Sequence, residues 1–158
     1  MSIRRLERYA VGLFFILAAG LMPAKAQEAE ATAVKAVDQA FYKALSTRDI
    51  KAMMAVWADG SYVVNIGPRS KKMDVGSSEV KRYWEGAFDY FTQMNASKTD
   101  ARIQIVGNVA LVIGSETAIL QPASGGDPLK FDTFVTHVFE KQGDQWLLVV
   151  HHAQMIPK

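Results

Sequence analysis

The last third of the chain constrains the fold most, because it contains two long strand-like runs joined by a short turn. Residues 131–140 and 146–155 are rich in β-branched and aromatic residues, and Gly143 and Asp144 between them are typical of a tight hairpin. The apolar run at 146–150 is continuous rather than alternating, which indicates that both faces of the hairpin are covered. The sequence therefore predicts an antiparallel pair of strands with other parts of the protein packed on both of its faces.

Patterns upstream of this hairpin complete the predicted order of elements. Residues 101–106 and 109–120 are strand-like runs separated by Gly107 and Asn108, a second hairpin signal. Apolar residues recur at helical spacing over 30–46, 50–57 and 77–94, and one more strand-like run covers 62–66. The order α-α-β-α-β-β-β-β predicts an α+β fold in which a curved antiparallel sheet wraps the N-terminal helices.

The helix predicted over residues 30–46 is amphipathic. Its apolar stripe contains Val34, Val37, Phe41 and Leu45. Its polar side contains four residues, which we expect to face solvent: Lys35, Asp38, Gln39 and Lys43. The stripe is therefore the face that packs against the sheet.

The first 26 residues have the pattern of a secretory signal peptide. Arg4, Arg5 and Arg8 precede an apolar core at 10–22, and the small residues around Ala26 form a cleavage site before Gln27. The apolar core is shorter than the roughly 20 residues that a membrane-spanning helix needs. We therefore expect a secreted, periplasmic protein with one mature domain at 27–158.

Removal of the signal peptide changes the charge of the chain. The full sequence has 18 basic and 16 acidic residues, and the segment after residue 26 keeps 14 basic and 15 acidic ones. A domain with this balance has no basic surface for nucleic acid or for anionic lipid. We expect neither a nucleic-acid partner nor, after cleavage, a membrane partner. The chain has no cysteine, so disulfides do not stabilise it.

The three histidines, His137, His151 and His152, all lie in the last hairpin. A two-residue turn would pair Val135 with His152, whereas a three-residue loop would pair Val135 with His151 and put His137 and His151 on one face. We prefer the second register. This register places Val149 beside the two histidines on the concave face. It also turns three apolar residues outward, namely Phe134, Val138 and Leu148. Apolar residues on the outer face predict a homodimer that forms through that face of the sheet.

No sequence motif points to a metal or a cofactor. There is no cysteine, the histidines lack metal-ligand spacing, and no glycine-rich phosphate loop occurs in the sequence. We therefore predict no metal site and no cofactor. The basic residues Arg69, Lys71 and Lys72 form either a solvated loop or the rim of a pocket mouth.

Short motifs in a fixed order connect the chain to a known superfamily. They are FYKALSTRD at 41–49, WADG at 57–60, SEVKRYW at 78–84, THVF at 136–139 and GDQW at 143–146. Together they resemble the nuclear transport factor 2-like superfamily, and within it the SnoaL-like proteins and the association domain of calcium/calmodulin-dependent protein kinase II. The resemblance implies a cone-shaped α+β barrel that encloses a pocket and often dimerises through its outer sheet face.

The resemblance also allows the catalytic groups of the superfamily to be compared with this chain. Members that resemble ketosteroid isomerase use a tyrosine, a carboxylate and a second acid at positions that match Phe41, Asn65 and His137. Phenylalanine donates no hydrogen bond and asparagine transfers no proton, so only His137 keeps an acid/base group. Members that resemble scytalone dehydratase use a histidine pair with tyrosines and an asparagine. These groups are similar in type, without a one-to-one alignment, to four residues of this chain: His137, His151, Tyr62 and Asn65.

These comparisons favour a protein that binds a small, largely apolar ligand without turnover. The alternative is a cofactor-free dehydratase, isomerase or cyclase in which His137 is the acid/base group and His151 assists. We expect the pocket to be lined by aromatic, apolar and amide side chains: Phe41, Trp57, Tyr62, Asn65, Tyr83, Trp84, Val135 and Val149.

Overall fold

The computed structural model describes residues 24–157. Almost all of the predicted signal peptide lies outside these residues, so its cleavage stays a prediction. The described part contains three helices and six strands: α1 (Ala24–Thr47), α2 (Ile50–Val56), β1 (Val64–Ile66), β2 (Asp74–Val75), α3 (Ser77–Tyr90), β3 (Phe91–Val106), β4 (Val109–Pro122), β5 (Leu129–Gln142) and β6 (Gln145–Met155). No helix among them is long and apolar enough to cross a membrane.

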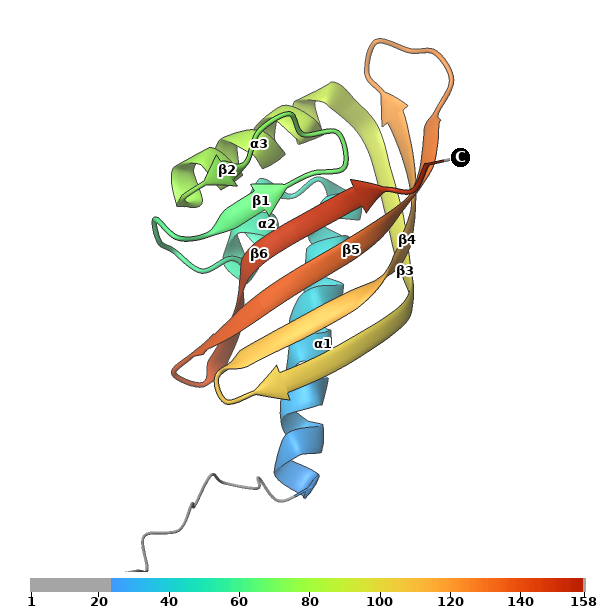
Figure 1. The fold of residues 1–158 in the computed structure, drawn as a ribbon. Coiled ribbons are helices and arrows are strands. Elements are labelled where there is room, and N and C mark those ends of the chain that lie inside the picture. The colour runs from blue at the N-terminus through green and yellow to red at the C-terminus, as the bar shows by residue number, and fades with distance from the viewer. Residues whose placement is uncertain (1–23, 158) are drawn as a thin grey trace, which may run out of the picture.

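The strands form one curved sheet in the order β2-β1-β6-β5-β4-β3. α1 lies across its concave face, and α2 and α3 lie near the end formed by β1 and β2 (Figure 1). The predicted α+β fold is confirmed. Two details differ: β1 runs parallel to β6, so the sheet is mixed, and β2 and β3 are its two edges, so the barrel is open.

Several predicted elements differ from the structure. The helix predicted over 30–46 begins at Ala24, and the segment between the predicted strand at 62–66 and the predicted helix at 77–94 contains β2, whose Asp74 pairs with Asn65 of β1. α3 ends at Tyr90 instead of residue 94, and β3 begins at Phe91 instead of residue 101. Residues 91–100 have mixed local preferences, and the backbone of the long strand β4 pairs with them up to Pro122. Tertiary pairing therefore decides the conformation of this segment.

The core lies between α1, α3 and the concave face of the sheet. Phe41 of α1 packs edge-on against Trp84 of α3, with 5.4 Å between ring centroids. From the sheet, Val112, Phe139 and Leu148 are buried against the helices. Each such side chain stabilises the fold by roughly 1.5–3 kcal/mol when it is fully buried. This packing holds α1 close to the inward residues of β5 and β6.

The hairpin register differs from both predicted alternatives. The turn consists of two residues, because Gln142 pairs with Gln145, but β6 has one extra residue at Val149, where the register shifts. Val135 consequently pairs with Ala153, and His137 pairs directly with His151. The two-residue turn pairs Leu148 with inward Phe139, and Leu148 is fully buried, so the prediction that Leu148 faces outward, which assumed a three-residue loop, was wrong.

Candidate functional site

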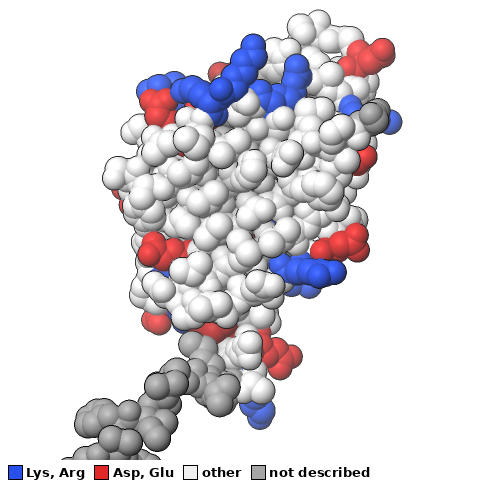
Figure 2. All heavy atoms as spheres, viewed as in Figure 1, with Lys and Arg blue, Asp and Glu red and all other residues white. Residues whose placement is uncertain are grey.

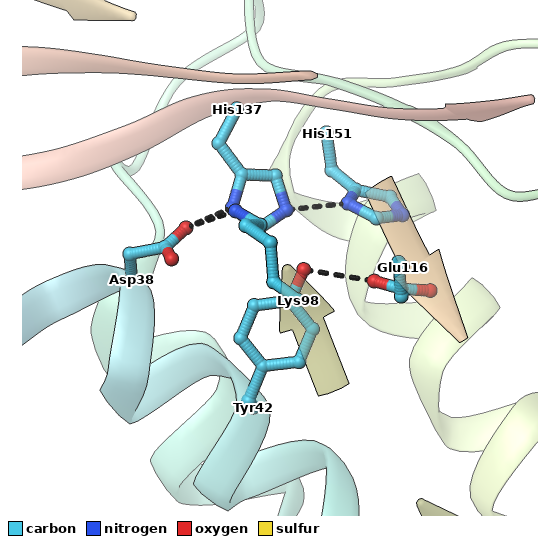
Figure 3. A network of polar contacts seen from close by, with 6 residues as sticks. All are labelled: Asp38, Tyr42, Lys98, Glu116, His137 and His151. Carbon is cyan, nitrogen blue, oxygen red and sulfur yellow. Dashed lines mark hydrogen bonds and ion pairs between the residues drawn. The ribbon is translucent and has the colours of Figure 1, made fainter. Parts of the chain in front are cut away.

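Four inward side chains stand in one row across the sheet. Val112, His137, His151 and Asn65 are paired in register across β4, β5, β6 and β1. All four are buried. We call this row the histidine row. Since paired residues point to the same face of a sheet, both imidazoles project toward α1, as Figure 3 shows.

The two histidines continue a hydrogen-bonded chain that begins on α1. Asp38 Oδ1 lies 2.6 Å from His137 Nδ1, and His137 Nε2 lies 2.8 Å from His151 Nδ1. A carboxylate accepts, so His137 carries its proton on Nδ1 and accepts at Nε2 from the Nδ1–H of His151. The remaining nitrogen, His151 Nε2, points away from His137 (Figure 3). In this tautomer it carries no hydrogen.

Lys98 supplies a positive charge behind this chain. Its Nζ lies 2.7 Å from Asp38 Oδ1 and 5.1 Å from the centre of the Tyr42 ring. Gly114 leaves room for the lysine, because a Cβ atom there would come within 3.0 Å of Lys98 Cγ and 2.8 Å of a backbone oxygen. The glycine therefore allows a buried Asp38–Lys98 ion pair.

Burial and neighbouring charges decide the protonation of this chain. Burial lowers the pKa of His137 to about 4, against the raising effect of Asp38. Burial, followed by the charges of His137 and Lys98, lowers the pKa of His151 well below its usual value. Burial alone would raise the pKa of Asp38, but the hydrogen bond from His137 and the charge of Lys98 outweigh it and lower the pKa. At neutral pH the chain is an aspartate and two neutral imidazoles.

A second acid, Glu116 of β4, lies on the same side of the sheet. Its carboxylate accepts hydrogen bonds from the Tyr42 hydroxyl at 2.8 Å and from the Thr133 hydroxyl at 3.4 Å. Burial raises the pKa of Glu116, with Tyr42 and Lys98 acting in the opposite direction. A buried carboxyl group with a raised pKa is suited to donate a proton.

His151 and Glu116 both line a cavity of about 110 Å³. A cavity of about 150 Å³ holds benzene, so this one suits a small organic group. Its other lining residues are mostly apolar or aromatic: Phe41, Leu45, Pro68, Arg69, Tyr83, Trp84, Ala87, Phe91, Met94, Ala96, Ala118, Leu120 and Phe131. Within the described part of the chain, the indole N–H of Trp84 is buried without a partner, and so are both polar amide atoms of Asn65 beside His151. Unpaired buried polar groups of this kind are rare and favour a ligand site.

The cavity brings together four of the predicted site residues, namely Phe41, Tyr83, Trp84 and His151. His137 lies behind His151 and does not line the cavity. Asn65, which is the neighbour of His151 on the other side of the histidine row, does not line it either. Val135 is buried within the sheet, and Val149 is the bulge residue; both are outside the cavity wall.

Two predicted pocket residues lie elsewhere. Tyr62 is half exposed, and its hydroxyl donates to Glu140 and accepts from Gln142 on the outside of the sheet. Trp57 lines a separate, more open hollow of about 490 Å³ between α2 and the start of α3. None of the histidines lines this larger hollow, so we place the chemistry in the smaller cavity.

Sequence patterns contained signals for the residues that prediction missed. Asp38 was placed on the solvent face of its helix, yet it is buried, because 34, 38, 41 and 45 follow one helical stripe. Glu116 stands at an inward position of a strand whose alternate residues are buried. A charged residue at a position that the helix or strand pattern reserves for apolar side chains was therefore the signal for each of these two site residues. Within residues 24–157, no group of three or more acidic, histidine or cysteine side chains is arranged to hold a metal ion.

Comparison with known protein families identifies the family of this chain. A sequence model of the SnoaL-like domain matches residues 34–157. The chain belongs to the SnoaL-like domain family. A comparison with curated proteins found no match.

Solved structures of the nuclear transport factor 2-like superfamily share the fold. A proposed dehydratase from Streptomyces avermitilis is 23% identical with a TM-score of 0.75, over 83% of this chain and 99% of that one. A proposed calcium/calmodulin-dependent protein kinase II association domain from Xanthomonas campestris is 19% identical with a TM-score of 0.69, over 79% and 86%. A hexachlorocyclohexane dehydrochlorinase is 11% identical with a TM-score of 0.74, over 85% and 90%. At these identities the likeness shows the fold alone.

Proposed function

We propose that this SnoaL-like protein is a cofactor-free enzyme that removes a proton from a small, largely apolar ligand, with His151 Nε2 as the general base. One observation carries the proposal: the chain from Asp38 through His137 ends at the imidazole that lines the cavity. Asp38 sets the tautomer of His137, and His137 sets that of His151. The bare nitrogen of a neutral imidazole is a base at neutral pH.

This assignment changes the roles expected from the sequence. His137, predicted as the acid/base group, is a positioning residue here, because it is fully buried behind His151. The sequence favoured binding without turnover, since the superfamily positions at Phe41 and Asn65 lack a proton donor and a carboxylate. His151 and Glu116 line the same cavity, and in our proposal they take these tasks as base and acid. The presence of these two groups at one cavity is our reason to favour an enzyme.

An elimination is the reaction that these two groups fit best. His151 Nε2 would take a proton from a carbon beside a carbonyl, and the C–H electron pair would form the new double bond. Burial raises the pKa of Glu116, and in its protonated form it would give its proton to the departing hydroxyl, so that water leaves as the C–O bond breaks. Solvent would then return the proton from His151 to Glu116. The indole N–H of Trp84, which lines the cavity and has no partner within residues 24–157, is the candidate to stabilise charge that develops on the carbonyl oxygen. Two proteins of similar fold carry the names dehydratase and dehydrochlorinase, which also denote eliminations.

Proton exchange into a small ketone tests the base without knowledge of the natural substrate. We expect the protein to accelerate the replacement of the α-protons of cyclopentanone by deuterium in D₂O, followed by NMR. The variant His151→Gln should lose the acceleration, because a general base contributes roughly 10²- to 10⁴-fold. The matched control is His152→Gln, since His152 is the next residue on β6 but is exposed.

The two variants separate the proposed chemistry from a general effect of imidazole on the protein surface. Equal losses in His151→Gln and His152→Gln would contradict the assignment of the base. If the wild-type protein accelerates no exchange above buffer, the enzyme proposal is wrong and binding without turnover takes its place.

A further inference from the structure

Arg69 lies at the edge of the cavity that His151 lines. Its side chain is exposed, and no hydrogen bond or ion pair to it occurs within residues 24–157. The residue belongs to the loop between β1 and β2, at the end of the molecule where α3 lies (Figure 1). Figure 2 shows lysine and arginine side chains gathered at that end. Arg69 is the member of this basic loop that the cavity includes.

The backbone around Arg69 forms a fixed turn. Ser70 N donates to Gly67 O at 3.0 Å, and Gly67 N donates to the Ser70 hydroxyl at 2.9 Å. Pro68 occupies the second position of this four-residue turn, where its ring restricts the backbone, and Arg69 occupies the third. A Cβ atom on Gly67 would overlap the hydroxyl of Tyr83, another residue of the cavity wall. The turn therefore packs directly on the wall and holds Arg69 at its mouth.

Within residues 24–157, the charges around the cavity leave Arg69 without a counter-ion. Among the described residues that line the cavity, Glu116 is the only acidic one. Its oxygens already accept from Tyr42 and Thr133, and the positive charge of Lys98 acts on it. His151 is neutral at physiological pH, because burial lowers its pKa. A ligand that fills this cavity thus meets one unpaired positive charge at the mouth and an apolar wall inside.

We infer that the ligand is a small apolar carboxylic acid, bound as its anion with the carboxylate on Arg69 and the hydrocarbon part in the cavity. The inference rests on the proposed function for the reaction at His151, but not for binding. A guanidinium group binds the two oxygens of one carboxylate in a bidentate pair, and the single positive charge of Arg69 balances the single negative charge of a carboxylate. The four-carbon body of 3-methylbutanoate is of a size suited to about 110 Å³ of cavity.

Calorimetric titration of the full chain with 3-methylbutanoate and 3-methylbutanamide tests this inference. The two probes have the same shape and differ in charge. We expect the carboxylate to bind the wild-type protein at least tenfold more tightly, and Arg69→Ala to remove most of that difference while it leaves the amide unchanged. Lys71→Ala is the matched control, because Lys71 is exposed on the same loop but does not line the cavity. It should change neither affinity more than twofold.

Every outcome bears on the inference. Equal affinity for the two probes, or an equal loss in Arg69→Ala and Lys71→Ala, would overturn it. Binding of the amide alone would overturn the carboxylate and leave the base at His151 in place. If neither probe binds, the cavity is not a ligand site, and the proposed function fails as well. Binding of the carboxylate to His151→Gln would separate the anion site from the chemistry, because this variant should keep Arg69 and lose only proton exchange.

Discussion

Acidification should destabilise this protein through His137. Burial lowers the pKa of the imidazole from 6.5 to about 4 in the folded chain. Between these pH values the unfolded chain binds the extra proton and the folded chain does not, so the free energy of unfolding falls as the pH falls. One pKa unit corresponds to 1.36 kcal/mol, so His137 contributes about 3 kcal/mol, present above pH 6.5 and lost below pH 4.

The charged groups around His137 act differently in this window. The lowered pKa of Asp38 matters only below its ordinary value of 3.8, and burial lowers the pKa of Lys98 from its ordinary value of 10.5. The lowered pKa of His151 acts in the same direction as that of His137. The raised pKa of Glu116 acts in the opposite direction, because the folded chain takes up that proton first. A comparison of variants is therefore needed to isolate His137.

Urea unfolding of the wild type, His137→Gln and His152→Gln at several pH values between 4 and 7 provides that comparison. We expect the wild type to lose about 3 kcal/mol more than His137→Gln over this range, out of a total stability of roughly 5–15 kcal/mol. His152 is exposed, so its variant should follow the wild type. Parallel curves for the wild type and His137→Gln would refute the argument, since they would place the titration elsewhere.

Three further predictions concern the sheet and the N-terminus. Phe134 and Ile113 are 57% and 41% exposed on the outer face of the sheet, and we expect them to lie in a homodimer interface. Phe134→Lys should therefore convert the dimer to a monomer in sedimentation at tens of micromolar, whereas a monomeric wild type would contradict this prediction. Gly114→Ala should displace Lys98 and destabilise the protein by about 1–3 kcal/mol in thermal unfolding, and an unchanged midpoint would contradict the role of the glycine. N-terminal sequencing of protein secreted by its host should begin at Gln27, whereas Met1 on the product would rule out the signal peptide.

Periodicity explains why much of the fold could be predicted. The helices, both long hairpins and the grouping of helices before the sheet follow from local patterns that tertiary packing reinforces. The start of β3 did not follow, because the segment from Phe91 becomes a strand only by pairing with β4. Tyr62 was expected in the pocket because it resembles in type the tyrosines of scytalone dehydratase, but its hydroxyl donates to Glu140 on the outside of the sheet.

The site was harder to predict than the fold, because one residue decides its geometry. Without the bulge at Val149, the two-residue turn would pair His137 with Val150, and His151 would point to the opposite face. Neither residue type nor turn length reveals a bulge in the middle of a strand. Asp38 is a different case, because its position on the apolar stripe was visible and was outweighed by its charge.

The cost of the polar groups argues that they serve the cavity rather than the fold. A buried ion pair such as Asp38–Lys98 loses hydration that its attraction seldom recovers, and apolar residues of similar size would often stabilise a core equally well or better. The same core leaves the Trp84 indole and the Asn65 amide without partners. A protein that needed only an apolar pocket would gain stability by replacing these groups. Their joint placement around His151 is explained if they orient a base and receive a polar ligand, which is the role that proton exchange and the paired carboxylate and amide probes measure.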